Sequence, residues 1–291
     1  MVEVIPLRYD AAFKKAFSQP QVFVAFVKDI LGIELDIDQV QRSYRYPKPV
    51  GSVDIEYDLF AEDRKSRAIV EIQHVKLCDI FDRFLYYFLI ALAEQIKSSQ
   101  RYQFDREVYT IVVLTSPTDI DYSMAIGRIE FIDEFRRKVE LYAHRIAFLI
   151  PPLVNDRTPE AARPWLELIN DSLDRQVDET RYTRPVLRQV IDAIAVDNIS
   201  PREMQKLIDE RAWEDTLADV REEGREEGMK QGLEEGLQQG RAEGEQHAKR
   251  QIARSMLQAG IDIETIVTAT GLSQDVIGSL FPASMNSSTP K

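Results

Sequence analysis

Acidic side chains recur on two neighbouring stretches of the chain in which polar and apolar residues alternate. The polar positions of residues 51–61 include Asp54, Glu56 and Asp58, and those of residues 67–73 include Glu71 and Gln73. Alternation with a period of two predicts β-strands. Because Asp and Glu are depleted in strands, their gathering on one face raises the hypothesis of a functional site.

The two stretches are separated by only five residues, Glu62 to Ser66, which predicts a β-hairpin. If the turn is centred between Arg64 and Lys65, Asp58 faces Glu71 and Glu56 faces Gln73. Directly opposed Cβ atoms lie about 4.5–5.5 Å apart, so two carboxylates there repel unless a cation compensates. Mg²⁺ is the natural cation, because it prefers oxygen ligands and one or two carboxylates. The pattern alone leaves a metal site and a solvated strand face both open.

The elements that must position these acids follow from periodicity. Residues 10–31 have apolar side chains at helical spacing, with a break at Pro20 and an end at Gly32. Residues 108–114 form a continuous apolar run, which predicts a strand covered on both faces, and residues 139–150 are a further strand candidate. A second helix is expected over residues 79–97. Its predicted apolar face consists of Phe81, Phe84, Leu85, Phe88 and Leu92.

The second half of the chain reads as helical. Pro164, Pro185 and Pro201 punctuate residues 159–213, and Ser200 with Glu203 has the spacing of a capping box. We therefore expect an α/β core of about 150 residues, a common domain size, followed by an all-helical C-terminal extension.

Several motifs together resemble one known family. The segments Asp58-Leu-Phe-Ala-Glu-Asp63 and Ile69-Val-Glu71-Ile-Gln73 are similar to the D…E-x-Q signature of the Rpn group. These proteins are recombination-promoting nucleases, also classed as transposases, within the PD-(D/E)XK nuclease superfamily. Flanking segments agree in order, and the resemblance covers nearly the whole chain. The flanking segments that agree are Asp10-Ala-Ala-Phe13-Lys14-Lys15-Ala-Phe17, Arg83-Phe-Leu-Tyr86-Tyr87, Ala93-Glu-Gln95-Ile96, Tyr102 with the strand 108–114, and the Glu-Gly repeats followed by Gly271-Leu272-Ser273.

The resemblance implies a restriction-endonuclease-like αβββαβ core with a mixed sheet, and Mg²⁺-dependent (or Mn²⁺-dependent) cleavage of phosphodiester bonds, chiefly in DNA. Asp58 and Glu71 would be metal ligands, and the carbonyl of Ile72 a third. Gln73 would stand where the wider superfamily has a lysine. Asp10 would be an accessory acid, and the residues alone explain it equally well as a helix N-cap.

Gln73 is uncharged, so it can orient a water molecule but cannot stabilise an anionic transition state as an ammonium group would. Lys14, Lys76 and Arg83 are candidates for the missing charge, and the sequence does not choose among them. The leading interpretation is a DNA endonuclease that promotes recombination or acts on mobile or foreign DNA. The alternative is a catalytically silent protein of the same fold that binds nucleic acid or protein. RNA as substrate stays open.

Six of the 12 glycines recur every fourth residue, from Gly224 to Gly244. Each glycine inside a helix costs about 1 kcal/mol relative to Ala, so such a helix needs a packing partner or frays. The segment is also acidic, since residues 214–247 carry 11 acidic and 4 basic side chains. A self-association helix and an acidic, loosely helical linker are both consistent with this pattern.

Residues 249–281 read as helix, turn and helix, with Gly271-Leu272-Ser273 at the turn. The spacing resembles a helix-turn-helix. The second helix, residues 273–280, has no Lys or Arg, which disfavours attraction to phosphate and favours a small bundle that contacts protein.

Composition limits the other possibilities. The chain has 291 residues, a net charge of −12, one cysteine and three histidines, which excludes a disulfide framework and a Cys/His zinc site. No apolar run is long enough to span a bilayer and no signal peptide is expected, so we predict a cytoplasmic protein without membrane contact. Its expected partners are DNA and other copies of the chain, bound through the C-terminal helices. The expected domains are a nuclease-like core (1–150), a helical extension (151–213), an acidic Glu/Gly segment (214–247), a helix-turn-helix-like unit (248–281) and a disordered tail (282–291).

Overall fold

A computed structural model describes residues 1–45, 55–74, 80–96, 103–116, 121–129, 131–139 and 143–280. The chain forms two compact units, Met1–Glu214 and Asp215–Lys291.

A six-stranded mixed sheet forms the centre of the first unit, with strand order β2-β3-β4-β5-β9-β6. β2, β3 and β4 are antiparallel neighbours, β4, β5 and β9 are parallel neighbours, and β6 is antiparallel to β9. Two short pairs, β1 with β10 and β7 with β8, lie outside this sheet. The strands are β1 (Val2–Glu3), β2 (Gln41–Arg45), β3 (Glu56–Glu62), β4 (Ser66–Gln73), β5 (Glu107–Leu114), β6 (Met124–Arg128), β7 (Phe131–Ile132), β8 (Lys138–Val139), β9 (Arg145–Leu149) and β10 (Gln176–Val177).

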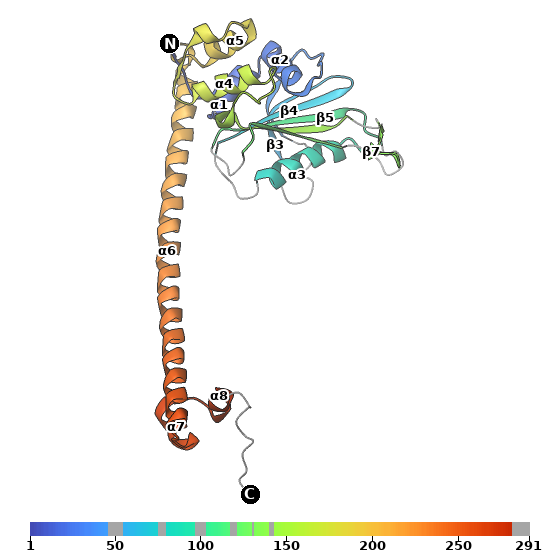
Figure 1. Cartoon of the computed structure of the whole chain (residues 1–291). Coiled ribbons are helices and arrows are strands. Elements are labelled where there is room, and N and C mark those ends of the chain that lie inside the picture. The colour runs from blue at the N-terminus through green and yellow to red at the C-terminus, as the bar shows by residue number, and fades with distance from the viewer. Residues whose placement is uncertain are drawn as a thin grey trace. The chain divides into compact units, whose positions relative to one another are not determined.

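Helices cover both faces of the sheet (Figure 1). On one face lie α1 (Asp10–Phe17), α2 (Pro20–Leu31), α4 (Arg163–Ser172) and α5 (Pro185–Ile194), and on the other lies α3 (Ile80–Ala93). The connections after β9 contain the single-turn 3₁₀ helices η1 (Pro151–Leu153), η2 (Glu179–Arg181) and η3 (Val196–Asn198). The order α1, α2, β2, β3, β4, α3, β5 is the αβββαβ core that the sequence predicts.

Two layers of buried side chains hold the sheet between its helices. Beneath α1 and α2, the rings of Phe17, Phe26 and Trp165 pack together, with the centroids of Phe26 and Trp165 5.1 Å apart. The layer beneath α3 is built around Tyr57, Phe84 and other buried apolar residues. Because α4 and α5 contribute to the first layer, the helices that follow the sheet in sequence pack into the same core as α1.

The structure confirms the boundaries predicted for the first helices and corrects others. Pro20 begins α2, and Gly32 ends it in the left-handed region at φ +69°. On α3, however, Phe81 and Leu85 are 36% and 45% exposed, so two positions of the predicted apolar face are wrong. The helix instead packs through Phe84, Phe88, Leu92 and the unpredicted Tyr87 and Ala91. In residues 139–150 the sheet strand begins only at Arg145, and the edge strand β6 was not expected.

The helices of the C-terminal region are α6 (Pro201–Gln258), α7 (Ile263–Thr270) and α8 (Gln274–Ser279). The predicted capping box at the start of α6 is confirmed: Ser200 N–H donates to Glu203 Oε2 at 2.8 Å, and Glu203 N–H donates to Ser200 Oγ at 3.3 Å. The second unit has a small core of Ala253, Ile266, Leu272 and Ile277. In the described part of the chain no helix combines the length and the apolar character needed to cross a membrane.

Candidate active site

Asp58 and Glu71 lie on the adjacent strands β3 and β4. The ladder between these strands pairs Leu59 with Val70 and Glu62 with Arg67, which is the alignment that the predicted turn gives. The alignment therefore brings Asp58 next to Glu71. The ladder pairs start at Leu59 and Val70, so the further prediction that Glu56 faces Gln73 stays a prediction. Glu56 forms an ion pair with Arg45 on β2, at 2.6 Å.

At Asp58 and Glu71, the side-chain carboxylates accept hydrogen bonds from backbone N–H groups of the neighbouring strand. The backbone N–H of Asp58 donates to Glu71 Oε1 at 3.3 Å, and the backbone N–H of Ile72 donates to Asp58 Oδ2 at 3.0 Å. Each carboxylate thus accepts a hydrogen bond from the strand that carries the other. This exchange fixes both side chains in the space between β3 and β4.

Strand β3 is irregular at the same place. Tyr57 packs into the layer beneath α3, whereas Leu59 packs into the layer beneath α1 and α2, so the alternation of side chains is broken at Asp58. On the neighbouring strand β2, Ser43 has a left-handed φ of +52°. Irregularities of this kind occur next to active sites, where they redirect a side chain. Because helices cover both faces of the sheet, β3 is buried on both faces, instead of on one as its sequence suggested.

Lys14 on α1 completes the cluster. Its Nζ lies 2.8 Å from Asp10 Oδ1 and 3.1 Å from Asp58 Oδ1, and it donates to Ser43 Oγ at 3.0 Å. Asp10 is the first helical residue of α1, and the N-cap is Tyr9, so the N-cap interpretation of Asp10 is wrong. The helix instead brings Asp10 and Lys14, one turn apart, to the carboxylate of Asp58.

Burial controls the protonation of these groups. Glu71 is 3% exposed, and its burial, with the nearby charge of Asp58, raises its pKa well above the usual range. Burial and the charge of Asp58 also raise the pKa of Asp10 to about 6, against the opposing effect of Lys14. Burial alone would lower the pKa of Lys14, but the attraction of Asp58 and Asp10 outweighs it and raises the pKa. The cluster thus holds more acid groups than one ammonium can neutralise.

Gln73 ends β4 and lies beside a different cation. Arg83 on α3 donates from its guanidinium to Gln73 Oε1 at 3.1 Å, and the same guanidinium lies 5.3 Å from the ring centroids of Phe84 and Tyr87. Tyr87 is anchored in turn, because Tyr57 Oη donates to its carbonyl at 2.9 Å. Of the three cations named from the sequence, Arg83 is therefore at Gln73 and Lys14 is at Asp58. Lys76 lies outside the described residues.

The donor set suits a hard divalent cation. Among the described residues no group of three or more His, Cys, Asp and Glu side chains is arranged to hold a metal ion, so Asp58 and Glu71 would act as a pair. Mg²⁺ is commonly held by one or two carboxylates, with water and substrate phosphate completing its shell. A buried carboxylate with a raised pKa, next to a second carboxylate, is also a group that a cation would stabilise in its ionised form.

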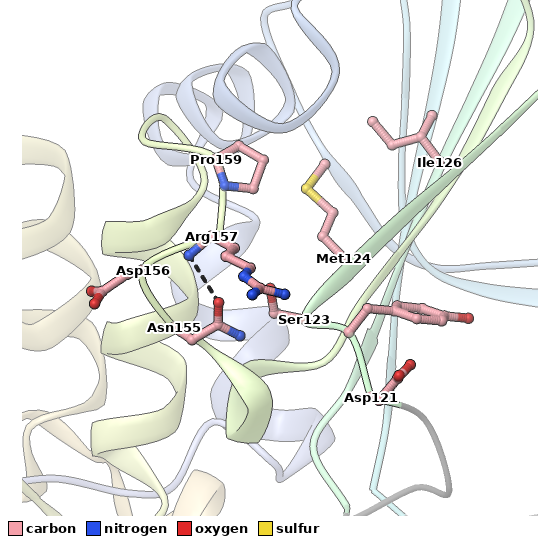
Figure 2. Close-up of a pocket in the computed structure, with 9 residues that line it drawn as sticks. Asp121, Ser123, Met124, Ile126, Asn155, Asp156, Arg157 and Pro159 are labelled. Atoms are coloured by element: carbon pink, nitrogen blue, oxygen red, sulfur yellow. Dashed lines mark hydrogen bonds between the residues drawn. The ribbon is translucent and has the colours of Figure 1, made fainter.

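A cavity of about 500 Å³ opens onto this cluster and is lined by residues of α1, β2 and α6, among them Asp10 and Lys14. A second cavity, of about 850 Å³, lies beside β6 and contains none of the predicted site residues. Figure 2 shows the Arg157 side chain turned toward Ser123 in that second cavity, while Asp156 projects away from it. Of these two cavities, the smaller one thus lies beside the acid cluster, where Asp10 and Lys14, but not Asp58 or Glu71, are among its lining residues.

Sequence reasoning missed two parts of the site. Ser43 lies on a strand without a clear pattern, and only its positive φ and its bond to Lys14 identify it. The cavity wall formed by α6, from Glu203 to Trp213, had no sequence signal beyond the capping box.

The comparisons with known proteins agree with this geometry. Residues 7–222 match the model of a family described as PD-(D/E)XK nuclease family transposase, and this range contains Asp10, Asp58, Glu71 and Gln73. Residues 246–281 match the C-terminal HTH domain of the Rpn/YhgA-like nuclease family. No curated protein and no solved structure matches the chain. The predicted resemblance to the Rpn group is confirmed.

Proposed function

Because the chain belongs to the PD-(D/E)XK nuclease family transposases, we propose that it is a metal-dependent DNA endonuclease with its active site at Asp58 and Glu71. The observation that carries the proposal is a pair of hydrogen bonds, at 3.3 and 3.0 Å, in which each carboxylate accepts from a backbone N–H of the strand that carries the other. To bind a cation between two strands, two acids must lie close together, and these hydrogen bonds support that arrangement.

Asp58 and Glu71 would hold the cation, which is Mg²⁺ or Mn²⁺. When bound, a divalent cation supplies positive charge next to the scissile phosphate and makes a water molecule more acidic. Asp10 and Lys14 orient Asp58 from the side of α1. On the other side, Gln73 orients the attacking water, and Arg83 supplies the positive charge that Gln73 lacks.

Plasmid nicking tests the proposal. Purified protein with Mg²⁺ is expected to nick supercoiled DNA, and chelation with EDTA should abolish nicking. Asp58→Asn and Glu71→Gln should each reduce the rate by about 1,000-fold, because several kcal/mol of charge stabilisation are lost. Asp38→Asn, an exposed position away from the cluster, is the matched control and should nick at the normal rate. Normal rates in both active-site variants, or cleavage of RNA in place of DNA, would overturn the proposal.

One observation favours a second candidate function. The ammonium of Lys14 lies 3.1 Å from Asp58 Oδ1 and neutralises part of the charge that a metal would otherwise balance. In a catalytically silent protein of the same fold, Lys14 would permanently take the place of the cation. Binding of DNA without nicking in Mg²⁺ or Mn²⁺ would support this alternative.

The C-terminal helices support two further proposals. Residues 246–281 match a helix-turn-helix model, which supports contact with DNA, although the second helix of the unit lacks basic residues. We also propose that two copies of the chain associate through α6. Met229, Leu233 and Leu237 are 72%, 64% and 56% exposed on this helix. They lie next to glycines at which an added Cβ would meet no atom of the described residues within 4 Å.

The protein is then expected to act on recombining, mobile or foreign DNA in the cytoplasm. A test in cells is the frequency of recombination between two markers upon expression of the wild-type chain. Asp58→Asn should reduce that frequency to the level without the protein.

A further inference from the structure

Trp213 is an exposed aromatic residue at the cavity that opens onto the acid cluster. Its side chain is 65% exposed, whereas Trp165 is fully buried and donates from its indole to Asp29 at 2.7 Å. A large apolar ring left in water loses the favourable burial that Trp165 gains. A ring in this position is available to a partner that comes from outside the fold.

The position of Trp213 is fixed by the start of α6. Glu203 is bonded to Lys15 at 3.1 Å as well as to Ser200, which ties the first turn of α6 to α1 beside Lys14. Trp213 follows ten residues later, about 15 Å along a helix axis. Trp213, Asp10 and Lys14 line the same cavity of about 500 Å³. Lys14 in turn contacts Asp58 at 3.1 Å, so a ligand that reaches the acid cluster past Lys14 can also meet the indole.

The charge around the cavity indicates which part of such a ligand meets Trp213. Asp209 and Glu210 line it on the α6 side, and Asp209 is held by Gln205 at 2.9 Å. These acids repel phosphate, so a neutral group is favoured against this wall. Besides Lys14, the cations that line the cavity are Arg42 and Lys206. Lys206 is exposed and has no ion pair with another residue that the structure describes, so it can contact phosphates at the rim.

We propose that Trp213 stacks on an unpaired base of the DNA strand whose phosphate lies at Asp58 and Glu71. Stacking of bases on aromatic side chains contributes about 1–3 kcal/mol per base and tolerates any sequence. A base inside an intact duplex cannot stack in this way, so the site selects single-stranded, gapped or locally opened DNA. The inference rests on the proposed nuclease function, and it adds the class of substrate.

Tryptophan fluorescence tests the proposal without catalysis. Asp58→Asn in the full chain, without divalent cations, is titrated with a single-stranded 12-nucleotide DNA and with a duplex of the same length. The single strand should quench the emission of Trp213, whereas buried Trp165 provides a constant background. Trp213→Ala should abolish the quenching and raise the Kd for the single strand about 5- to 100-fold, leaving the Kd for the duplex unchanged. Trp213→Phe should retain most of the affinity.

Ile208→Ala is the matched control, because Ile208 is 54% exposed on the same helix but does not line the cavity. It should bind both DNAs normally. Equal affinity of wild type and Trp213→Ala for the single strand would overturn the proposal. A Trp213→Ala variant whose oligomer mass changes while its affinity for DNA does not would overturn it as well. The two hypotheses fail separately: nicking with no effect of Trp213→Ala removes only the stacking site, and quenching without nicking removes only the nuclease.

Discussion

At the scale of single residues, the ammonium group of Lys14 partly neutralises the acids that gather at β3 and β4. Asp10, Asp58 and Glu71 would repel one another without a cation. Lys14 bonds to the first two at 2.8 and 3.1 Å, while Glu71, buried and without that ammonium, has a raised pKa. The ammonium and a divalent cation are therefore two ways to neutralise the same group of oxygens.

Arg83 is expected to supply the positive charge at Gln73. Arg83→Gln removes that charge, so kcat for nicking should fall about 100-fold, the loss typical for one transition-state donor, while KM for DNA changes little. Arg83→Lys keeps a charge at the same place and should recover part of the rate. Nicking rates over a range of DNA concentrations measure both values.

Asp82→Asn, a change of charge at an exposed neighbouring position, controls for general effects on α3 and should leave the rate unchanged. The melting temperatures of all variants show whether α3 is still packed. A wild-type kcat for Arg83→Gln in a folded protein would show that Arg83 has no part in the reaction.

The sequence was sufficient to predict that Asp58 and Glu71 lie next to each other, because strand alternation and a short turn fix which residues meet. It could not choose among the cations. The contact between Lys14 and Asp58 joins residues 44 positions apart on a helix and a strand, and the contact between Arg83 and Gln73 depends on how α3 lies on the sheet. Contacts of this kind follow from packing of whole elements, which periodicity does not describe.

At the scale of elements, the irregularities of β2 and β3 matter more than their regular parts. Ser43 and Asp58 interrupt adjacent strands, and the interruption turns Asp58 toward Lys14. A pattern of alternating residues predicts an unbroken strand, which is why the sequence suggested one wet face for β3. The two-sided burial arises because helices cover both faces of the sheet.

The attachment of α6 to α1 should depend on pH through Glu203. The hydrogen bond from the Ser200 side chain, with further bonds from Ser200 N–H and Lys15, lowers the pKa of Glu203 to about 2. A depressed carboxylate pKa stabilises the fold fully above the unfolded value of about 4.5 and loses this effect as the pH falls toward 2. Glu203→Gln should therefore lower Tm at pH 6, and the difference from wild type should shrink at pH 3.

Glu226→Gln, an exposed acid further along α6, is the control and should have the same small effect at both pH values. Thermal unfolding followed by circular dichroism gives the four Tm values. A difference for Glu203→Gln that stays constant between pH 6 and pH 3 would contradict the role of the ionised carboxylate.

At the scale of the whole molecule, α6 is the element that the sequence left undecided. The glycine spacing was consistent with a helix or with a linker, and the structure forms a helix from Pro201 to Gln258. Six glycines in it cost about 6 kcal/mol relative to Ala, and a Cβ added at any of them would meet no atom of the described residues within 4 Å. A helix with this cost and with exposed Met229, Leu233 and Leu237 gains stability if a second copy packs along the glycines.

Replacing glycines of α6 by alanine has opposite expected effects on the stability of the helix and on the association of two copies. In Gly228→Ala, Gly232→Ala, Gly236→Ala the helix itself should become more stable, by about 1 kcal/mol per position, since an added Cβ meets nothing within 4 Å inside the chain. If a second helix approaches the glycines closely, the same three methyl groups clash with it. The triple variant should therefore be more helical by circular dichroism and yet dissociate at least 10-fold more readily in analytical ultracentrifugation. The control is Glu234→Ala with Gln238→Ala, at positions about 200° around the helix from Gly232 and Gly236, and it should leave association unchanged. An equal or tighter dimer in the glycine variant would rule out close packing of two copies along this face.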